Sequence, residues 1–102
     1  MEIKMAEHFN KLTPAEAERL AMLAEEAGEI VQMVGKILRH GYESYHPNDC
    51  DKTTNRILLM SEIKDLIGVV GGMAQANDLP LIEEGDIEFA WDRKLIHSHH
   101  QS

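Results

Sequence analysis

The sequence predicts an all-α protein made of a helical hairpin and a third, shorter helix. Two observations point to this fold class. Aromatic residues make up only 5% of the chain, and the other apolar residues are mainly Leu, Ile, Val, Met and Ala, a mixture that favours helices over sheets. Apolar side chains also recur at spacings of three and four along residues 20–38 and 57–76, which is the period of a helix with one buried face.

Composition narrows the class of protein before any motif is considered. A chain of 102 residues with 43% hydrophobic residues suits one domain with a modest core, so residues 1–102 are expected to form a single domain. The formal net charge of −8 disfavours nucleic acid as a partner, because phosphate neutralisation needs a basic surface. A single cysteine, no apolar run of about 20 residues and no signal-peptide pattern predict a cytoplasmic protein without a membrane segment.

The first long helix has local signals at both ends. Thr13 can cap it, Pro14 suits its first position, and Glu16 completes a capping box. Near its C-terminus are basic residues that suit the negative end of the helix dipole, namely Lys36, Arg39 and His40, and Gly41 then gives a stop signal. Residues 1–12 before this helix are interpreted as an N-terminal arm, either a helical turn or a frayed tail.

Residues 41–52 are expected to form a loop. They contain the turn signal Pro47-Asn48-Asp49 and both tyrosines of the chain, Tyr42 and Tyr45. A connection of roughly twelve residues is long for a compact domain, which indicates a functional loop. The tyrosines are interpreted as packing onto the domain rather than as stacking on a base.

The second helix is expected to begin after Thr53 or Thr54, either of which can cap it. Gly68, Gly71 and Gly72 lie inside this helix, where each costs up to about 1 kcal/mol relative to alanine. We therefore expect a neighbouring backbone to approach closely at these glycines.

A third helix is expected over residues 81–96, where Ile87, Trp91 and Leu95 repeat every four residues. Residues 97–102 are expected to be a frayed tail. Three helices with wide apolar faces do not easily close a core alone, whereas two hairpins side by side make a four-helix core. The expected architecture is therefore a four-helix-bundle-type core shared by two chains, as an obligate homodimer or a dimer of dimers.

Two pairs of carboxylates flank the apolar stripes of the two long helices. Residues three apart share a helix face, so Glu26 pairs with Glu29 and Glu62 pairs with Asp65. If the helices pack side by side, the four carboxylates converge, and their repulsion requires a cation nearby. Oxygen-only ligands suit Mg²⁺, or Mn²⁺, rather than zinc. Either pair alone is better explained by a solvated acidic face, but the presence of both favours a metal site.

The two motifs resemble those of the MazG-like all-α nucleoside triphosphate pyrophosphatase superfamily. The family pattern is Glu-Glu-x-x-Glu on one helix and Glu-x-x-Asp on the next, which here are Glu25-Glu26-Ala27-Gly28-Glu29 and Glu62-Ile63-Lys64-Asp65. The resemblance extends over most of the chain from Thr13 onward. The segment between the motifs, residues 30–61, is longer than is usual in this family, and Ser61 stands where many members carry a further acidic residue.

The resemblance implies a specific reaction and a specific set of residues. Mg²⁺ would be bound by Glu26, Glu29, Glu62 and Asp65, and a nucleoside triphosphate would be cleaved into a monophosphate and pyrophosphate. Either Glu25 or Glu29 would orient or deprotonate the attacking water. A polyphosphate also needs protein cations, for which the candidates are Lys36, Arg39, Lys52, Arg56 and Lys64.

Two other functions stay open at this point. Within the same fold, the chain could be a phosphoribosyl-ATP pyrophosphohydrolase, which a panel of substrates would distinguish. From a different class, it could be a non-catalytic helical dimer that binds a protein partner, with the acidic residues merely solvated.

Overall fold

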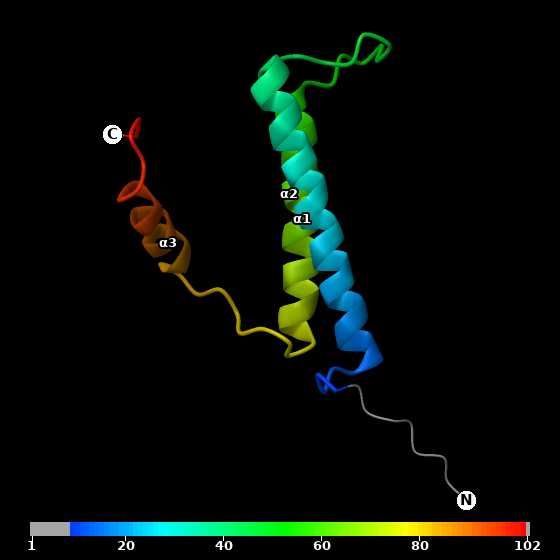
Figure 1. The fold of residues 1–102 in the computed structure, drawn as a ribbon, viewed down its shortest axis with the longest axis vertical. Coiled ribbons are helices and arrows are strands. Elements are labelled where there is room, and N and C mark those ends of the chain that lie inside the picture. The colour runs from blue at the N-terminus through cyan, green and yellow to red at the C-terminus, as the bar shows by residue number, and fades with distance from the viewer. Residues whose placement is uncertain (1–8, 102) are drawn as a thin grey trace, which may run out of the picture.

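The computed structural model describes residues 9–101, which form three helices and no strand (Figure 1). Helix α1 spans Pro14–His40, α2 spans Asn55–Gln75 and α3 spans Asp86–Leu95. The predicted all-α class is confirmed for this part of the chain. Residues 1–8 of the predicted arm lie outside the described residues, and residues 96–101 add no helix after α3.

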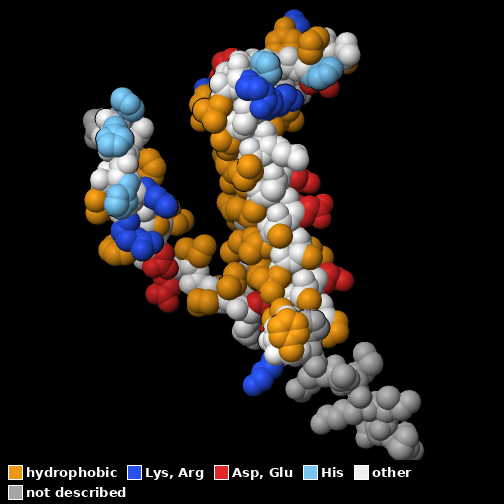
Figure 2. Space-filling view, viewed as in Figure 1, with side chains coloured by type: hydrophobic (Ala, Val, Ile, Leu, Met, Phe, Trp, Pro, Cys, Tyr) orange, Lys and Arg blue, Asp and Glu red, His pale blue; other side chains and the backbone are white. Residues whose placement is uncertain are grey.

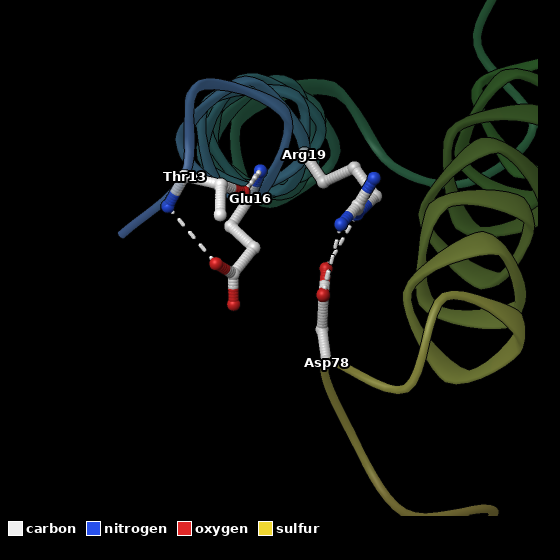
Figure 3. A network of polar contacts seen from close by, with 4 residues as sticks. All are labelled: Thr13, Glu16, Arg19 and Asp78. Carbon is white, nitrogen blue, oxygen red and sulfur yellow. Dashed lines mark hydrogen bonds and ion pairs between the residues drawn. The ribbon is translucent and has the colours of Figure 1, made fainter. Parts of the chain in front are cut away.

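Helix α1 begins and ends as the sequence predicts. The Thr13 hydroxyl accepts a hydrogen bond from the Glu16 N–H at 3.1 Å, and the Glu16 carboxylate accepts one from the Thr13 N–H at 2.9 Å (Figure 3). This capping box satisfies backbone donors that the first turn leaves without partners. At the other end, Gly41 has φ +88° and donates its N–H to the Ile37 carbonyl at 2.7 Å. Thr54, one of the two predicted caps, begins α2.

Asn55 fixes the α1–α2 loop to the start of α2. Its buried side chain donates from Nδ2 to the Gly41 carbonyl at 3.1 Å, and its backbone N–H donates to the Ser44 carbonyl at 2.8 Å. The guanidinium of Arg56 lies over the Tyr42 ring, with Cζ 4.3 Å from the ring centroid. Tyr42 therefore packs onto the domain, and the loop closes the hairpin at a defined position.

The third helix is shorter than predicted, and the expected start at residue 81 is wrong. Gly85 has φ +93°, a left-handed conformation that interrupts a helix and favours glycine. Just before it, the Glu83 N–H donates to the Asp86 carboxylate at 2.6 Å. Residues 80–83 consequently form an irregular connection between α2 and α3.

Helices α1 and α2 run antiparallel and pack along their lengths, whereas α3 contacts neither of them (Figure 1). The residues of each helix that face the other recur at spacings of three and four. We call these residues the seam: Arg19, Leu23, Glu26, Ile30, Met33 and Ile37 on α1, and Asn55, Leu59, Glu62, Leu66, Val69 and Met73 on α2. Glu26 and Glu62 thus lie within the seam, rather than at the edge of an apolar stripe as predicted.

One side of the hairpin is apolar. Two antiparallel helices are related by a two-fold axis perpendicular to the plane that contains them. Residues that follow a seam residue by one position in the sequence therefore point to the same side of the hairpin on both helices. We call that side the apolar side, and its members are Leu20, Ala27, Val31, Val34 and Leu38 on α1 and Met60, Ile63, Ile67, Val70 and Ala74 on α2. Figure 2 shows hydrophobic side chains along the hairpin on the side towards α3, and acidic side chains on the opposite edge.

The chain buries little of its apolar surface. Among residues 9–101, only Met33 and Met73 are buried apolar side chains. A Cβ built at Gly68, Gly71 or Gly72 meets no atom within 4 Å, so the close backbone approach predicted there is not made within one chain. None of the three helices combines the length and the apolar character that crossing a membrane requires.

Candidate metal centre

Three carboxylates converge where α1 and α2 face each other. Glu26 comes from α1, and Glu62 and Asp65 come from α2, with one oxygen of each lying within 4.8 Å of the others. The two glutamates occupy seam positions, and Asp65 lies one residue before the seam position Leu66. The helical pairing therefore brings together three of the four metal ligands that the sequence predicted.

The two glutamates are partly withdrawn from water. Oε2 of Glu26 and Oε2 of Glu62 are buried and have no hydrogen-bond partner in the described structure. Burial, followed by repulsion from Glu29 and Asp65, raises the pKa of Glu26. A hydrogen bond with Glu29, together with burial and the other carboxylates, raises the pKa of Glu62 to about 6. The arrangement thus disfavours the charged form of both groups unless a cation is present.

Glu29 joins the cluster from α1, while Glu25 does not. The Glu29 carboxylate raises the pKa of both Glu26 and Glu62, so the Glu29 side chain lies close to the three converging carboxylates. Both Glu25 and Glu29 lie one residue before a seam position, on the side of the hairpin opposite the apolar side, but Glu25 is exposed and Glu29 is only half-exposed. Of the two predicted candidates for handling a water molecule, Glu29 is the one in contact with the cluster.

An open groove of about 490 Å³ runs beside the carboxylates on this side of the hairpin. Its α1 wall contains Arg19, Met22 and Glu26, and its α2 wall contains Lys64, Asp65, Gly68, Val69 and Gly72. The groove therefore has carboxylates towards one end and a glycine-lined, apolar stretch towards the other. Two basic side chains, Arg19 and Lys64, stand at its walls.

Arg19 was not among the sequence-based candidates. Its Nε and NH2 groups donate to Oδ2 and Oδ1 of Asp78 at 2.5 and 2.9 Å (Figure 3). These hydrogen bonds lower the pKa of the Asp78 carboxyl and raise that of Arg19. The pair fixes the position of the chain just after α2 against the first turns of α1. Its one signal in the sequence is the seam register, in which Arg19 lies seven residues before Glu26.

The five predicted phosphate contacts are not brought to one place. Lys64 lines the groove, but Lys36, Arg39, Lys52 and Arg56 do not. Arg56 instead donates to the Glu43 carboxylate at 2.7 Å and covers the Tyr42 ring. This difference arises because these four residues lie at or near the loop end of the hairpin, whereas the groove runs from the carboxylate cluster towards the other end.

The donor set of the cluster consists of carboxylate oxygens alone, which is the ligand chemistry that Mg²⁺, Mn²⁺ and Ca²⁺ prefer. A groove with basic walls beside such a cluster has room for an anionic ligand that a cation would bridge to the carboxylates.

Comparison with protein-family models, with curated proteins and with solved structures finds no match to this chain.

Proposed function

We propose that this chain is a Mg²⁺-dependent nucleotide pyrophosphohydrolase of the MazG-like type, which hydrolyses a (d)NTP to a (d)NMP and pyrophosphate. The observation that supports the proposal most directly is the carboxylate cluster of Glu26, Glu62 and Asp65, joined by Glu29. Two of its buried oxygens have no partner, and a buried charged oxygen without a partner is costly. A bound cation would supply the missing partner for both oxygens.

The residues present fit a hard divalent cation. Glu26, Glu62 and Asp65 would hold it, with Glu29 as the fourth oxygen donor. When bound, Mg²⁺ neutralises phosphate charge and lowers the pKa of a coordinated water. Among residues 9–101, no sulfur or imidazole ligand lies in the cluster, which argues against a site built for zinc.

The remaining residues of the site would bind and orient the substrate. Lys64 stands at the wall of the groove beside Asp65, where its ammonium group can neutralise a phosphate that the carboxylates would otherwise repel. Glu29 would accept the proton of the water that adds across the α–β phosphoanhydride bond. The exposed Cys50 fits a reducing compartment, so a cytoplasmic location belongs to the proposal.

The active species would be a homodimer that packs through the apolar sides of two hairpins. The radius of gyration is 18.7 Å, against about 13 Å for a compact chain of this length. The accessible surface is 9002 Å², about 3,000 Å² more than a compact chain of this mass exposes. An excess of that size suits the area that obligate dimers bury, and the apolar sides supply the matching surface for a four-helix core.

The deciding experiment is a pyrophosphate-release assay on a panel of NTPs and dNTPs, with phosphoribosyl-ATP included, in Mg²⁺ and in EDTA. Metal-dependent release from one or a few nucleotides would support the proposal and identify the substrate. Release from phosphoribosyl-ATP alone would assign the histidine-pathway reaction instead. No release from any substrate, and no thermal shift with Mg²⁺ plus nucleotide, would refute the enzymatic proposal and favour a helical binding module.

A further inference from the structure

Among the described residues, helix α3 packs against neither of the other helices. It contacts neither α1 nor α2, and its large apolar side chains are exposed, Ile87 at 74% and Trp91 at 55%. A ten-residue helix is marginal in water without tertiary packing. The side chains of α3 therefore require a surface that another part of the assembly provides.

The groove beside the carboxylates offers such a surface. Gly68 and Gly72 lie one helical turn apart in its wall, next to Val69 and Met22. A Cβ at either glycine would meet no atom within 4 Å, although each glycine costs up to about 1 kcal/mol inside a helix. A bare, glycine-lined strip next to apolar side chains allows a second helix to approach closely.

Length and charge match between α3 and the groove. From Gly72 to Asp65 the groove follows seven residues of α2, roughly 10 Å at the helical rise, and the same spacing separates Ile87 from Lys94 on α3. The last turn of α3 contains Arg93 and Lys94 beside Asp92 and is net positive, whereas the first turn contains Asp86 and Glu88. If α3 lies with its last turn near Asp65, its cations face the carboxylate cluster and its acidic first turn lies away from it.

The geometry also indicates which copy of α3 fits. The groove residues Met22, Asp65, Gly68 and Gly72 each come one residue before a seam position, so the groove lies opposite the apolar side. The apolar side is the one towards the chain's own α3 (Figure 2). Suppose that a second hairpin covers the apolar side of the first. The second hairpin then lies between the first hairpin and its α3. The α3 helix of the first chain therefore faces the side of the second hairpin that carries the groove.

We propose that α3 of each chain docks in the groove of a second copy and brings Arg93 and Lys94 to the rim of that copy's carboxylate cluster. The proposal rests on the dimer put forward above and deepens it: each site is complete only when the other chain supplies its cations. There, Arg93 and Lys94 contact the phosphates of the anionic substrate, which compensates for the four predicted basic residues that do not line the groove.

Disulfide trapping in the full chain tests the docking without relying on activity. In a Cys50→Ser background, one preparation carries Met22→Cys and another carries Ala90→Cys, and the two are unfolded, mixed, refolded and oxidised. We expect a covalent two-chain product from the mixture, at least tenfold more than from either variant alone. A matched control replaces Met22→Cys with Gly28→Cys, at a helical position that is not part of the groove. A chain carrying both Met22→Cys and Ala90→Cys reports docking within one chain.

A disulfide formed within one chain by the double variant would overturn the proposal in favour of docking onto the chain's own hairpin. Equal trapping at Gly28→Cys, or no trapping at all, would also overturn it. If the two-chain product forms but no nucleotide is hydrolysed, the docking stands and the enzymatic function fails, so the two failures are distinguishable.

Mixing two impaired variants tests the shared site. Asp65→Asn damages the cluster but leaves α3 intact, whereas the double substitution Arg93→Ala and Lys94→Ala leaves the cluster intact and should raise KM about tenfold or more. In the refolded mixture, about a quarter of all sites combine an intact cluster with an intact α3 from the other chain. Activity at low substrate is expected to exceed the sum of the two separate variants. An activity equal to that sum would show that each chain uses its own α3 and would refute the proposal.

Discussion

The two sides of the α1–α2 hairpin are incomplete in different ways. The apolar side exposes side chains such as Val31, Leu38 and Ile67, and only more apolar surface can cover it. The carboxylate cluster lies in the seam and on the opposite side. The buried oxygens of Glu26 and Glu62 have no partner among the described residues, and only a cation or a proton can complete them. One pair of helices thus carries an apolar surface on one side and a cluster of carboxylates at the seam and on the other side.

The largest expected effect breaks the acidic side. Asp65→Asn removes one ligand charge while keeping the shape of the side chain. Because a bound metal contributes several kcal/mol to stabilising phosphate charge, we expect pyrophosphate release to fall about 10²- to 10³-fold. Glu18→Gln, at an exposed position of α1 outside the groove, is the matched control and should retain full activity. Unchanged release by Asp65→Asn would remove this residue from the site.

The next effect breaks the apolar side. Val34→Glu places a charge in the proposed dimer interface, and an uncompensated buried charge costs about 3–5 kcal/mol. The dissociation constant of the dimer should therefore rise about 10²-fold or more, as measured by analytical ultracentrifugation. Gln32→Glu adds the same charge at an exposed position one residue before the seam and should leave the dimer intact. Dissociation by both variants, or by neither, would argue against an interface through the apolar side.

The sequence predicted helix boundaries and the carboxylate cluster with different accuracy, because some of the interactions that determine them are local in the sequence and others are not. Helix α1 could be bounded closely since its caps, Thr13, Glu16 and Gly41, act on neighbouring residues. The start of α3 could not, because it depends on the left-handed conformation adopted by Gly85. The cluster was predictable from spacing three on each helix, whereas the burial of Glu26 depends on how α1 is rotated against α2.

The contacts that fix that rotation connect residues far apart in the sequence. Arg19, near the start of α1, and Asp78, just after α2, are 59 residues apart in the sequence, and no local pattern pairs them. Asn55, which has no distinguishing signal in the sequence, is buried and donates a hydrogen bond to the Gly41 carbonyl. Lys64 reaches the groove because it lies beside the cluster on α2, whereas Arg56 lies in the first turn of α2 and contacts the loop.

A smaller effect concerns the seam between the two sides. The pKa of Glu62 is raised from 4.5 to about 6, so the metal-free folded state binds more protons than the unfolded state in this interval. Its contribution to stability is fully present below pH 4.5 and is lost as the pH rises through about 6. In EDTA, Glu62→Gln should therefore melt at a higher temperature than the parent at pH 7, with the difference vanishing near pH 4.5.

Circular dichroism melts at several pH values measure this difference, with Glu18→Gln as the control that should follow the parent chain. Adding Mg²⁺ at pH 7 is expected to raise the melting temperature of the parent more than that of Glu62→Gln. A Glu62→Gln variant that is less stable than the parent at pH 7 without metal would contradict the inference that the charged Glu62 carboxylate destabilises the metal-free protein.

The smallest effect compares two ion pairs at opposite ends of the hairpin. The side chains of Arg19 and Asp78 are 27% and 11% exposed, whereas those of Arg56 and Glu43 are 61% and 71% exposed. Water screens the second pair more strongly, so Asp78→Asn should lower the melting temperature measurably and Glu43→Gln should not.

The contribution of Asp78 to stability should also depend on pH. The pKa of Asp78 lies below its ordinary value of 3.8, so the unfolded chain binds more protons than the folded chain in acid. The stability that Asp78 contributes at neutral pH is therefore lost as the pH falls through the folded-state pKa. The difference between the melting curves of the parent and Asp78→Asn should therefore shrink as the pH is lowered, and a difference that stays constant in acid would mean that Asp78 acts through packing rather than through its charge.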